Sequence, residues 1–238
     1  MKTIGLIGGM SFESSLVYYR MINEAVRSRL GGLNSAEVIL HSVDFARIVA
    51  LQKAGRWDCA AKALSDVARG LEAAGADTVL ICTNTMHLVA DAVADAVRIP
   101  LINIIDETAA SLSAAGCLRP LLLATRYTME HGFYAERMAR HGIEIMVPDA
   151  DGRTRTHEII FDELCQGRIE AASRDDLLAL IETAKAAGAD AVILGCTEIC
   201  LILDPAALPL PGFDSTEIHA VAAVDFALAD RAQERQVA

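Results

Sequence analysis

The chain has 238 residues, of which 53% are hydrophobic, enough for one large domain or two small ones with packed cores. Its formal net charge of −11 and its lack of basic clusters argue against nucleic acid as a partner. No apolar run reaches the roughly 18 residues that span a bilayer, the first residues do not read as a signal peptide, and six scattered cysteines fit a reducing compartment. We therefore expect a cytoplasmic protein with no membrane partner.

Short aliphatic runs alternate with longer stretches of helical period, which is the pattern of βα units in a mostly parallel sheet. We expect strands at residues 3–7, 37–41, 78–82, 101–104, 121–124, 144–147, 191–194 and, more weakly, 210–213. Helices are expected between them, among them residues 11–29, 57–73 and 175–187. In the first helix, apolar residues recur at helical spacing and predict one buried stripe: Phe12, Leu16, Tyr19, Ile22 and Val26.

The chain contains an internal repeat, in which "EAAGADTVLICTNT" aligns with "KAAGADAVILGCTEI". The offset between the copies grows by one residue between their Gly-Ala-Asp turns and their cysteines, Cys82 and Cys196, so the second copy carries one extra residue, most simply Gly195. Two similar α/β halves are the expected fold. Halves of this kind tend to face each other with both cysteine loops in one cleft, although repetition alone leaves that arrangement open.

Cys82 and Cys196 each follow a predicted strand, at the edge where open α/β folds bind ligands. The N-terminus of the following helix can hold a carboxylate and lower the pKa of a thiol, and a bound amino acid's ammonium group would favour the thiolate further. Two such thiols on opposite sides of a carbon acid suit a two-base racemisation, in which one removes the α-proton and the other protonates the opposite face. The four lysines lie at a strand start or at polar helix positions, which favours a route without a pyridoxal phosphate cofactor.

Other interpretations of these cysteines remain open. A single cysteine at a strand end is most often a small buried apolar residue, and duplication of a structural turn would leave the same repeated pattern. A disulfide between the two does not suit a reducing compartment. Cys196 and Cys200 have the spacing of neighbours on a helix, but no further ligand follows at a familiar interval, so we expect no metal site.

Three further features allow two interpretations each. The glycines of "GLIGGMS" do not follow the dinucleotide-binding pattern, and either admit a small ligand near Met10 and Ser11 or form a tight turn. His87 either faces solvent or packs locally, or it influences the site at the Cys82 loop. Arg47, which follows a predicted strand, meets a substrate carboxylate or lies exposed at the start of a helix.

The motifs "IGLIGGMS", "CTNTMH", "LLATRYTM", "FDELCQG" and "GCTEI", in this order along nearly the whole chain, resemble the aspartate/glutamate racemase family, whose members act without pyridoxal phosphate. The resemblance implies two similar Rossmann-like or flavodoxin-like domains related by pseudo-symmetry, an active site in the cleft between them, and Cys82 and Cys196 as the catalytic pair. It also implies an amino-acid substrate, no cofactor, a homodimer, and domains of residues 1–98 plus 210–238 and of residues 99–209. The implied substrate contacts are Met10, Ser11, Thr83, Asn84, Thr85, Thr125, Thr128, Thr197 and Glu198.

One departure from the family pattern bears on the substrate. Members specific for aspartate carry a basic residue where "FDELCQG" presents Cys165, so this chain is more similar to the broad-specificity branch. Arg47 and Arg168 keep acidic substrates open. Two alternatives remain: another enzyme of the same fold, such as a maleate isomerase, a hydantoin racemase or a malonate decarboxylase, and a non-catalytic protein that binds amino acids.

Overall fold

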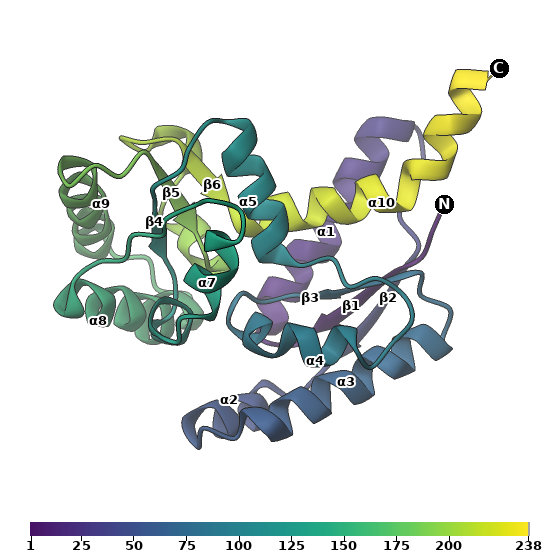
Figure 1. The fold of residues 1–238 in the computed structure, drawn as a ribbon, viewed down its shortest axis with the longest axis horizontal. Helices are drawn as coiled ribbons and strands as arrows, with labels where there is room; N and C mark the ends of the chain where they lie inside the picture. Colours follow the sequence, from purple (N-terminus) through teal and green to yellow (C-terminus); the bar gives the residue numbers. More distant parts are fainter. Residues whose placement is uncertain (238) are drawn as a thin grey trace. The chain divides into compact units, whose positions relative to one another are not determined.

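The protein is described by a computed structural model that covers residues 1–237, with side chains for residues 1–230. The chain forms two compact units, Met1–Asn103 with His219–Ala238, and Ile104–Ile218 (Figure 1). The chain passes from one unit to the other at residues 103/104 and 218/219. The boundaries expected from the sequence, 98/99 and 209/210, lie a few residues earlier. Residues 212–214 belong to the second unit because they pair with its sheet. Residue 238, the end of the predicted first domain, lies outside the described residues.

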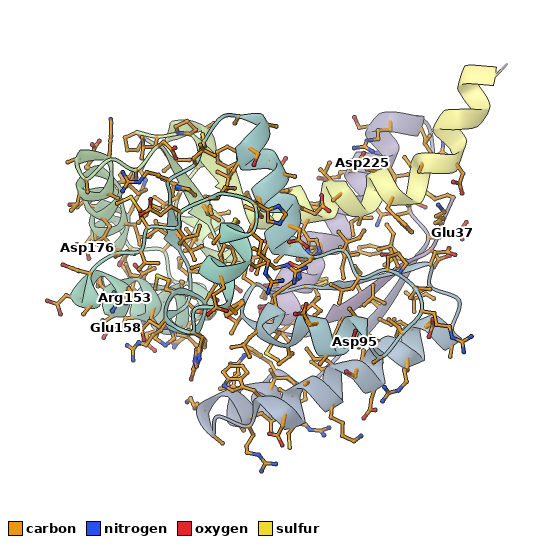
Figure 2. All side chains as sticks on the ribbon, in the orientation of Figure 1. Glu37, Asp95, Arg153, Glu158, Asp176 and Asp225 are labelled. Atoms are coloured by element: carbon orange, nitrogen blue, oxygen red, sulfur yellow. The ribbon has the colours of Figure 1, made fainter. Side chains whose placement is uncertain are left out.

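The first unit contains a parallel sheet in the order β2-β1-β3, formed by β1 (Ile4–Gly8), β2 (Val38–Ser42) and β3 (Thr78–Ile81). Its helical segments are α1 (Phe12–Leu30), α2 (Phe45–Lys53), α3 (Trp57–Ala73), η1 (Thr85–Val89), α4 (Ala90–Ala94) and, from His219 onward, α10 (Ser215–Val237), whose first turn belongs to the second unit. Alternating strand residues face opposite sides of the sheet: Leu6 packs with α1 and α10, whereas Ile7 packs with α2, α3 and α4. An ion pair between Arg29 and Asp225 also joins α1 to α10, and Figure 2 labels Asp225.

The second unit contains a parallel sheet in the order β4-β5-β6, formed by β4 (Pro120–Leu123), β5 (Ala191–Leu194) and β6 (Gly212–Asp214). Its helical segments are α5 (Ile104–Ala114), α6 (Arg126–Glu130), α7 (Phe133–Ala139), α8 (Ala150–Glu158), η2 (Ile159–Glu163), η3 (Leu164–Gln166), α9 (Ala171–Ala186), η4 (Thr197–Leu201) and η5 (Pro205–Ala207). Its buried residues again form two clusters, one with α9 on one face and one with α5 and α7 on the other. Arg155 of α8 pairs with Asp176 of α9 at 2.7 Å, and Figure 2 labels Asp176.

The two units repeat one topology. In the first, β1 pairs with β2 and β3, and a single bridge adds Leu101 beside β3. In the second, β4 pairs with β5, a single bridge adds Met146 on its other side, and β6 lies beside β5. The prediction of two similar parallel α/β units is therefore confirmed.

Two expectations about individual elements were wrong. The predicted strands at 101–104 and 144–147 each shrink to one bridging residue, because Ile104 already begins α5 and Pro148 follows the second segment. The predicted stripe of α1 also splits into two faces. Ile22 and Val26 are buried together with Tyr18, whereas the other three members point to solvent: Phe12, Leu16 and Tyr19.

The described helices include none that is both long enough and apolar enough to cross a bilayer.

Candidate active site

Cys82 directly follows β3 in the first unit. Its N–H donates to the carbonyl of Ile7 at 3.0 Å, so the residue continues the sheet register. Its side chain is fully buried among apolar residues of α1, β3 and α10. Burial raises the pKa of the Cys82 thiol well above its usual value, because apolar surroundings disfavour the thiolate. Without a ligand, Cys82 therefore carries its proton.

The predicted residues around Cys82 gather at one edge of this sheet. Because β1 and β3 pair in register at Ile7 and Ile81, the segments that follow them begin at the same edge. One segment carries buried Met10 and half-buried Ser11, whose hydroxyl caps α1 by accepting from Ser14 N–H at 3.3 Å. The other segment carries Thr83, which is half-buried, and Asn84 and Thr85, which are buried.

The glycines that precede Met10 are explained by packing. A Cβ on Gly8 would approach Ser15 Oγ to 2.5 Å and a methyl of Leu40 to 2.6 Å. Gly9 adopts φ +85, and a Cβ there would lie 2.3 Å from the carbonyl oxygen of Val43. Of the two interpretations of "GLIGGMS", the tight turn accounts for both glycines.

Cys196 occupies a different register from Cys82. In the second unit, the N–H that continues the sheet belongs to Gly195, which donates to Leu123 O at 2.8 Å. Gly195 thus occupies the place of Cys82, which confirms it as the inserted residue of the second copy. A Cβ at Gly195 would lie 2.9 Å from a methyl of Leu122, so the position admits little besides glycine. Cys196 comes one residue later and is half-buried.

Cys196 forms a hydrogen-bonded cluster with its two successors. Its thiol donates to Glu198 Oε2 at 2.9 Å, and the hydroxyl of Thr197 donates to the same oxygen at 2.7 Å. Burial raises the pKa of the Cys196 thiol, and the negative charge and hydrogen bond of Glu198 raise it further. The backbone N–H of Glu198, at the start of η4, lowers the pKa of Cys196 as expected of a helix N-terminus, but burial and the Glu198 carboxylate raise that pKa more.

Cys165 lies close enough to this cluster to interact with it. It sits in η3, after the π-helical turn η2, and its thiol interacts electrostatically with both Cys196 and Glu198. Although Cys165 is exposed, partial desolvation of its thiol, followed by the charge of Glu198, raises the pKa of Cys165 to about 12. Cys200 packs against the core and contacts the Asp214 carboxylate. This packing gives Cys200 a structural role rather than that of a metal ligand.

The two predicted threonines and the two candidate arginines differ in their surroundings. Thr125 follows β4, and its hydroxyl lies 3.1 Å from the hydroxyl of Thr128; both side chains are buried. Because β4 and β5 are paired, this cluster shares an edge with Cys196. Arg47 is exposed in α2, and Arg168 is exposed and donates to the carbonyl of Asp162.

His87 is not solvent-facing, which corrects one of the sequence-based alternatives. It is 5% exposed, its Nδ1 lies 2.9 Å from the carbonyl oxygen of Thr83, and its ring contacts that of His219. His219 in turn contacts Tyr18. The sequence carried no signal for this cluster, because its members are far apart in the chain.

Among the described residues, no group of three or more His, Cys, Asp or Glu side chains is arranged to hold a metal ion.

Comparison with known proteins decides the family. The family model described as Asp/Glu/Hydantoin racemase matches residues 7–223. The chain belongs to the Asp/Glu/Hydantoin racemase family. This membership confirms the family resemblance of the five motifs and identifies the protein as a racemase, a class of isomerase.

Solved structures that resemble this chain support its membership of the Asp/Glu/Hydantoin racemase family. A Yersinia pestis protein proposed to be an Asp/Glu racemase is 49% identical, with 96% of this chain and 100% of that chain covered and a TM-score of 0.91. An aspartate racemase homologue from Pyrococcus horikoshii is 35% identical, with 95% and 99% covered and a TM-score of 0.85. The aspartate racemase of Picrophilus torridus, at 24% identity, covers 95% of this chain and 94% of its own, and its TM-score of 0.74 shows the shared fold.

Proposed function

We propose that the protein is a cofactor-independent amino-acid racemase in which Cys82 and Cys196 act on the same α-carbon from opposite faces. The observation that carries the proposal is that each unit presents one cysteine at the carboxyl end of the same strand of a repeated topology. Membership of the racemase family supports it. The two thiols need not be equivalent, because each serves one enantiomer as base and the other as acid.

The hydrogen bond from Cys196 to Glu198 supports a route to the thiolate. In this step, the S–H bond of Cys196 breaks and the Glu198 carboxylate takes the proton. The Cys196 thiolate then removes the α-proton, and the Cys82 thiol protonates the opposite face of the carbanion. The product is inverted, Cys82 is left as a thiolate, and exchange of protons with solvent restores the starting state.

Hydroxyl and amide groups at the two strand edges suit the substrate's own carboxylate. In the first unit these are Thr83, Asn84 and Thr85, close to Met10 and Ser11; in the second, they are Thr125, Thr128 and Thr197. Hydrogen bonds from such groups would strengthen as charge moves onto the carboxylate during α-proton removal, which lowers the barrier.

The surroundings of Cys165 favour a substrate with an uncharged side chain. Cys165 is uncharged and adjoins Cys196 and the carboxylate of Glu198, so this corner of the site offers no positive charge to a second carboxylate. Arg47 and Arg168 are exposed cations that could meet a second carboxylate. Acidic amino acids are therefore the second candidate class of substrate.

We propose further that the protein works as a cytoplasmic homodimer. The six cysteines are free thiols, as in a reducing compartment. Phe12, Leu16 and Tyr19 are 63%, 57% and 52% exposed on one face of α1, which is costly in water. A two-fold axis through Leu16 would pack this face against its copy in antiparallel fashion and bring Glu13 close to Arg20 of the second subunit.

The test is incubation with single L- and D-amino acids in heavy water without cofactor, with α-proton loss followed by NMR and configuration by chiral chromatography. We expect exchange with inversion in the wild-type protein, and a loss of inversion of roughly 100-fold or more in Cys82→Ser and in Cys196→Ser. Full racemisation by both variants would refute the proposal. If the protein instead converts a hydantoin or maleate, it catalyses another reaction known for this fold. If it binds amino acids without α-proton exchange, a non-catalytic role is supported.

A further inference from the structure

A chain of buried polar side chains lies behind the cysteine loop of the first unit. It begins at Tyr18 of α1, whose hydroxyl lies 2.8 Å from Nδ1 of His219 in α10. The ring of His219 meets that of His87 edge to face, with centroids 5.7 Å apart. His87 Nδ1 then lies 2.9 Å from the carbonyl oxygen of Thr83, the residue that follows Cys82.

The hydrogen-bond partners fix the protons along this chain. His219 Nε2 lies 2.9 Å from the carbonyl oxygen of Ile102, which can only accept, so Nε2 carries the proton and Nδ1 accepts from the Tyr18 hydroxyl. The same reasoning at the Thr83 carbonyl makes His87 Nδ1 a donor. Burial, aided by the nearby His87, lowers the pKa of His219 to about 3, so its ring is neutral near neutral pH.

Each of these side chains is costly to bury and would be easy to replace by an apolar one. Tyr18 and His219 are fully buried and His87 is 5% exposed. The chain of contacts ends at the peptide that follows Cys82. The Thr83 N–H donates to the carbonyl of Ile81 at 2.8 Å, so the His87 hydrogen bond holds the remaining polar group of that residue's backbone.

We infer that His87, backed by His219 and Tyr18, is a positioning residue that holds the loop of Cys82 in the geometry that proton transfer requires. The inference rests on the proposed role of Cys82 in racemisation. The reacting atoms in such a step must be placed to within a fraction of an ångström, and a small displacement of the loop costs rate without unfolding the protein. His87 itself touches the peptide rather than the substrate.

Two variants separate the hydrogen bond from the bulk of the ring. His87→Leu removes the donor, whereas His87→Asn carries an amide N–H close to where Nδ1 lies. For each variant, α-proton exchange in heavy water is measured separately from the L- and the D-enantiomer. Cys82→Ser identifies the enantiomer that depends on Cys82 as base. His141→Asn, an exposed histidine paired with Asp106 in the second unit, is the matched control.

We expect His87→Leu to slow exchange by about tenfold or more from the enantiomer that depends on Cys82, and much less from the other. His87→Asn should recover most of this loss, and His141→Asn should behave as wild type. Sustained exchange from the second enantiomer shows that the variants are folded. Equal losses on both enantiomers, or an Asn variant as slow as the Leu variant, would overturn the inference. A wild-type protein that exchanges neither enantiomer refutes the proposed function and the role of His87 with it.

Discussion

The thiol of Cys196 and the carboxylate of Glu198 lie 2.9 Å apart, from sulfur to Oε2, two residues from each other in the chain. The contact stabilises the protonated thiol, because a second negative charge beside the carboxylate is unfavourable. The same contact provides the nearest acceptor for that proton. One carboxylate can thus keep Cys196 unreactive without substrate and still receive its proton when substrate alters the local field.

Glu198→Gln should make Cys196 more reactive. Burial, the first cause of the raised pKa, stays in place, but the negative charge is lost, so the pKa of the Cys196 thiol falls and more thiolate is present at a given pH. We expect severalfold faster alkylation of Cys196 by iodoacetamide at mildly alkaline pH, measured by fragment mass spectrometry that separates it from Cys200. Glu158→Gln, at an exposed glutamate of α8 (Figure 2), is the control. Unchanged or slower alkylation of Cys196 would contradict the assigned electrostatics.

His219 should make the fold sensitive to acid. Its pKa is about 3 in the folded protein, against 6.5 for an ordinary histidine, so between these values the unfolded chain binds a proton that the folded chain does not. The stability that His219 contributes is therefore present above about pH 6.5 and is lost as pH falls. From about pH 6 to about pH 5, the wild-type free energy of unfolding should fall by about 1 kcal/mol more than that of His219→Gln. Urea unfolding at the two pH values measures this, and parallel losses would argue against a neutral buried His219.

Cys165→Lys should shift substrate preference towards acidic amino acids. The new ammonium group would lie near Glu198 and Cys196, where the present thiol offers no charge to a distal carboxylate. A charged hydrogen bond of this kind supports a change of roughly tenfold or more in kcat/KM for aspartate relative to a neutral amino acid. Cys165→Met keeps the position uncharged and should leave the ratio near the wild-type value. A ratio that does not change in the lysine variant would show that Cys165 does not adjoin the substrate side chain.

Leu16→Lys should yield a monomer. A two-fold axis through Leu16 would bring two ammonium groups together and remove the centre of the apolar face formed with Phe12 and Tyr19. Sedimentation velocity of the variant is compared with that of Leu118→Lys, which changes a similarly exposed leucine of the second unit. If Leu16→Lys remains as dimeric as wild type, the dimer forms through another surface.

Sequence patterns correctly predicted the helices and strands whose formation depends mainly on their own residues. The strand at 191–194 and the helix at 57–73 have the predicted bounds, because both combine a strong apolar pattern with clear ends. The internal repeat also predicted Gly195 as the inserted residue, which the sheet register bears out.

Features that depend on distant segments could not be predicted in the same way. The buried side of α1 is set by α10, nearly 200 residues later, so Tyr18 faces the core while Leu16 and Tyr19, on the periodic stripe, do not. The burial of His87 likewise depends on His219. The raised pKa of Cys196 depends on the orientation of Glu198, which spacing along the chain does not specify.

The single glycine that displaces Cys196 from the sheet register has a consequence for how mirror-image substrates are handled. An ancestor with two identical halves would present matched thiols to both enantiomers, whereas here the Cys82 thiol is fully buried and Cys196 is half-buried. Because mirror images have equal free energy, kcat/KM must be the same for both directions, but kcat and KM are free to differ separately. Under the proposed mechanism, one inserted codon thus lets the enzyme saturate with one enantiomer earlier than with the other, without changing the racemic end point.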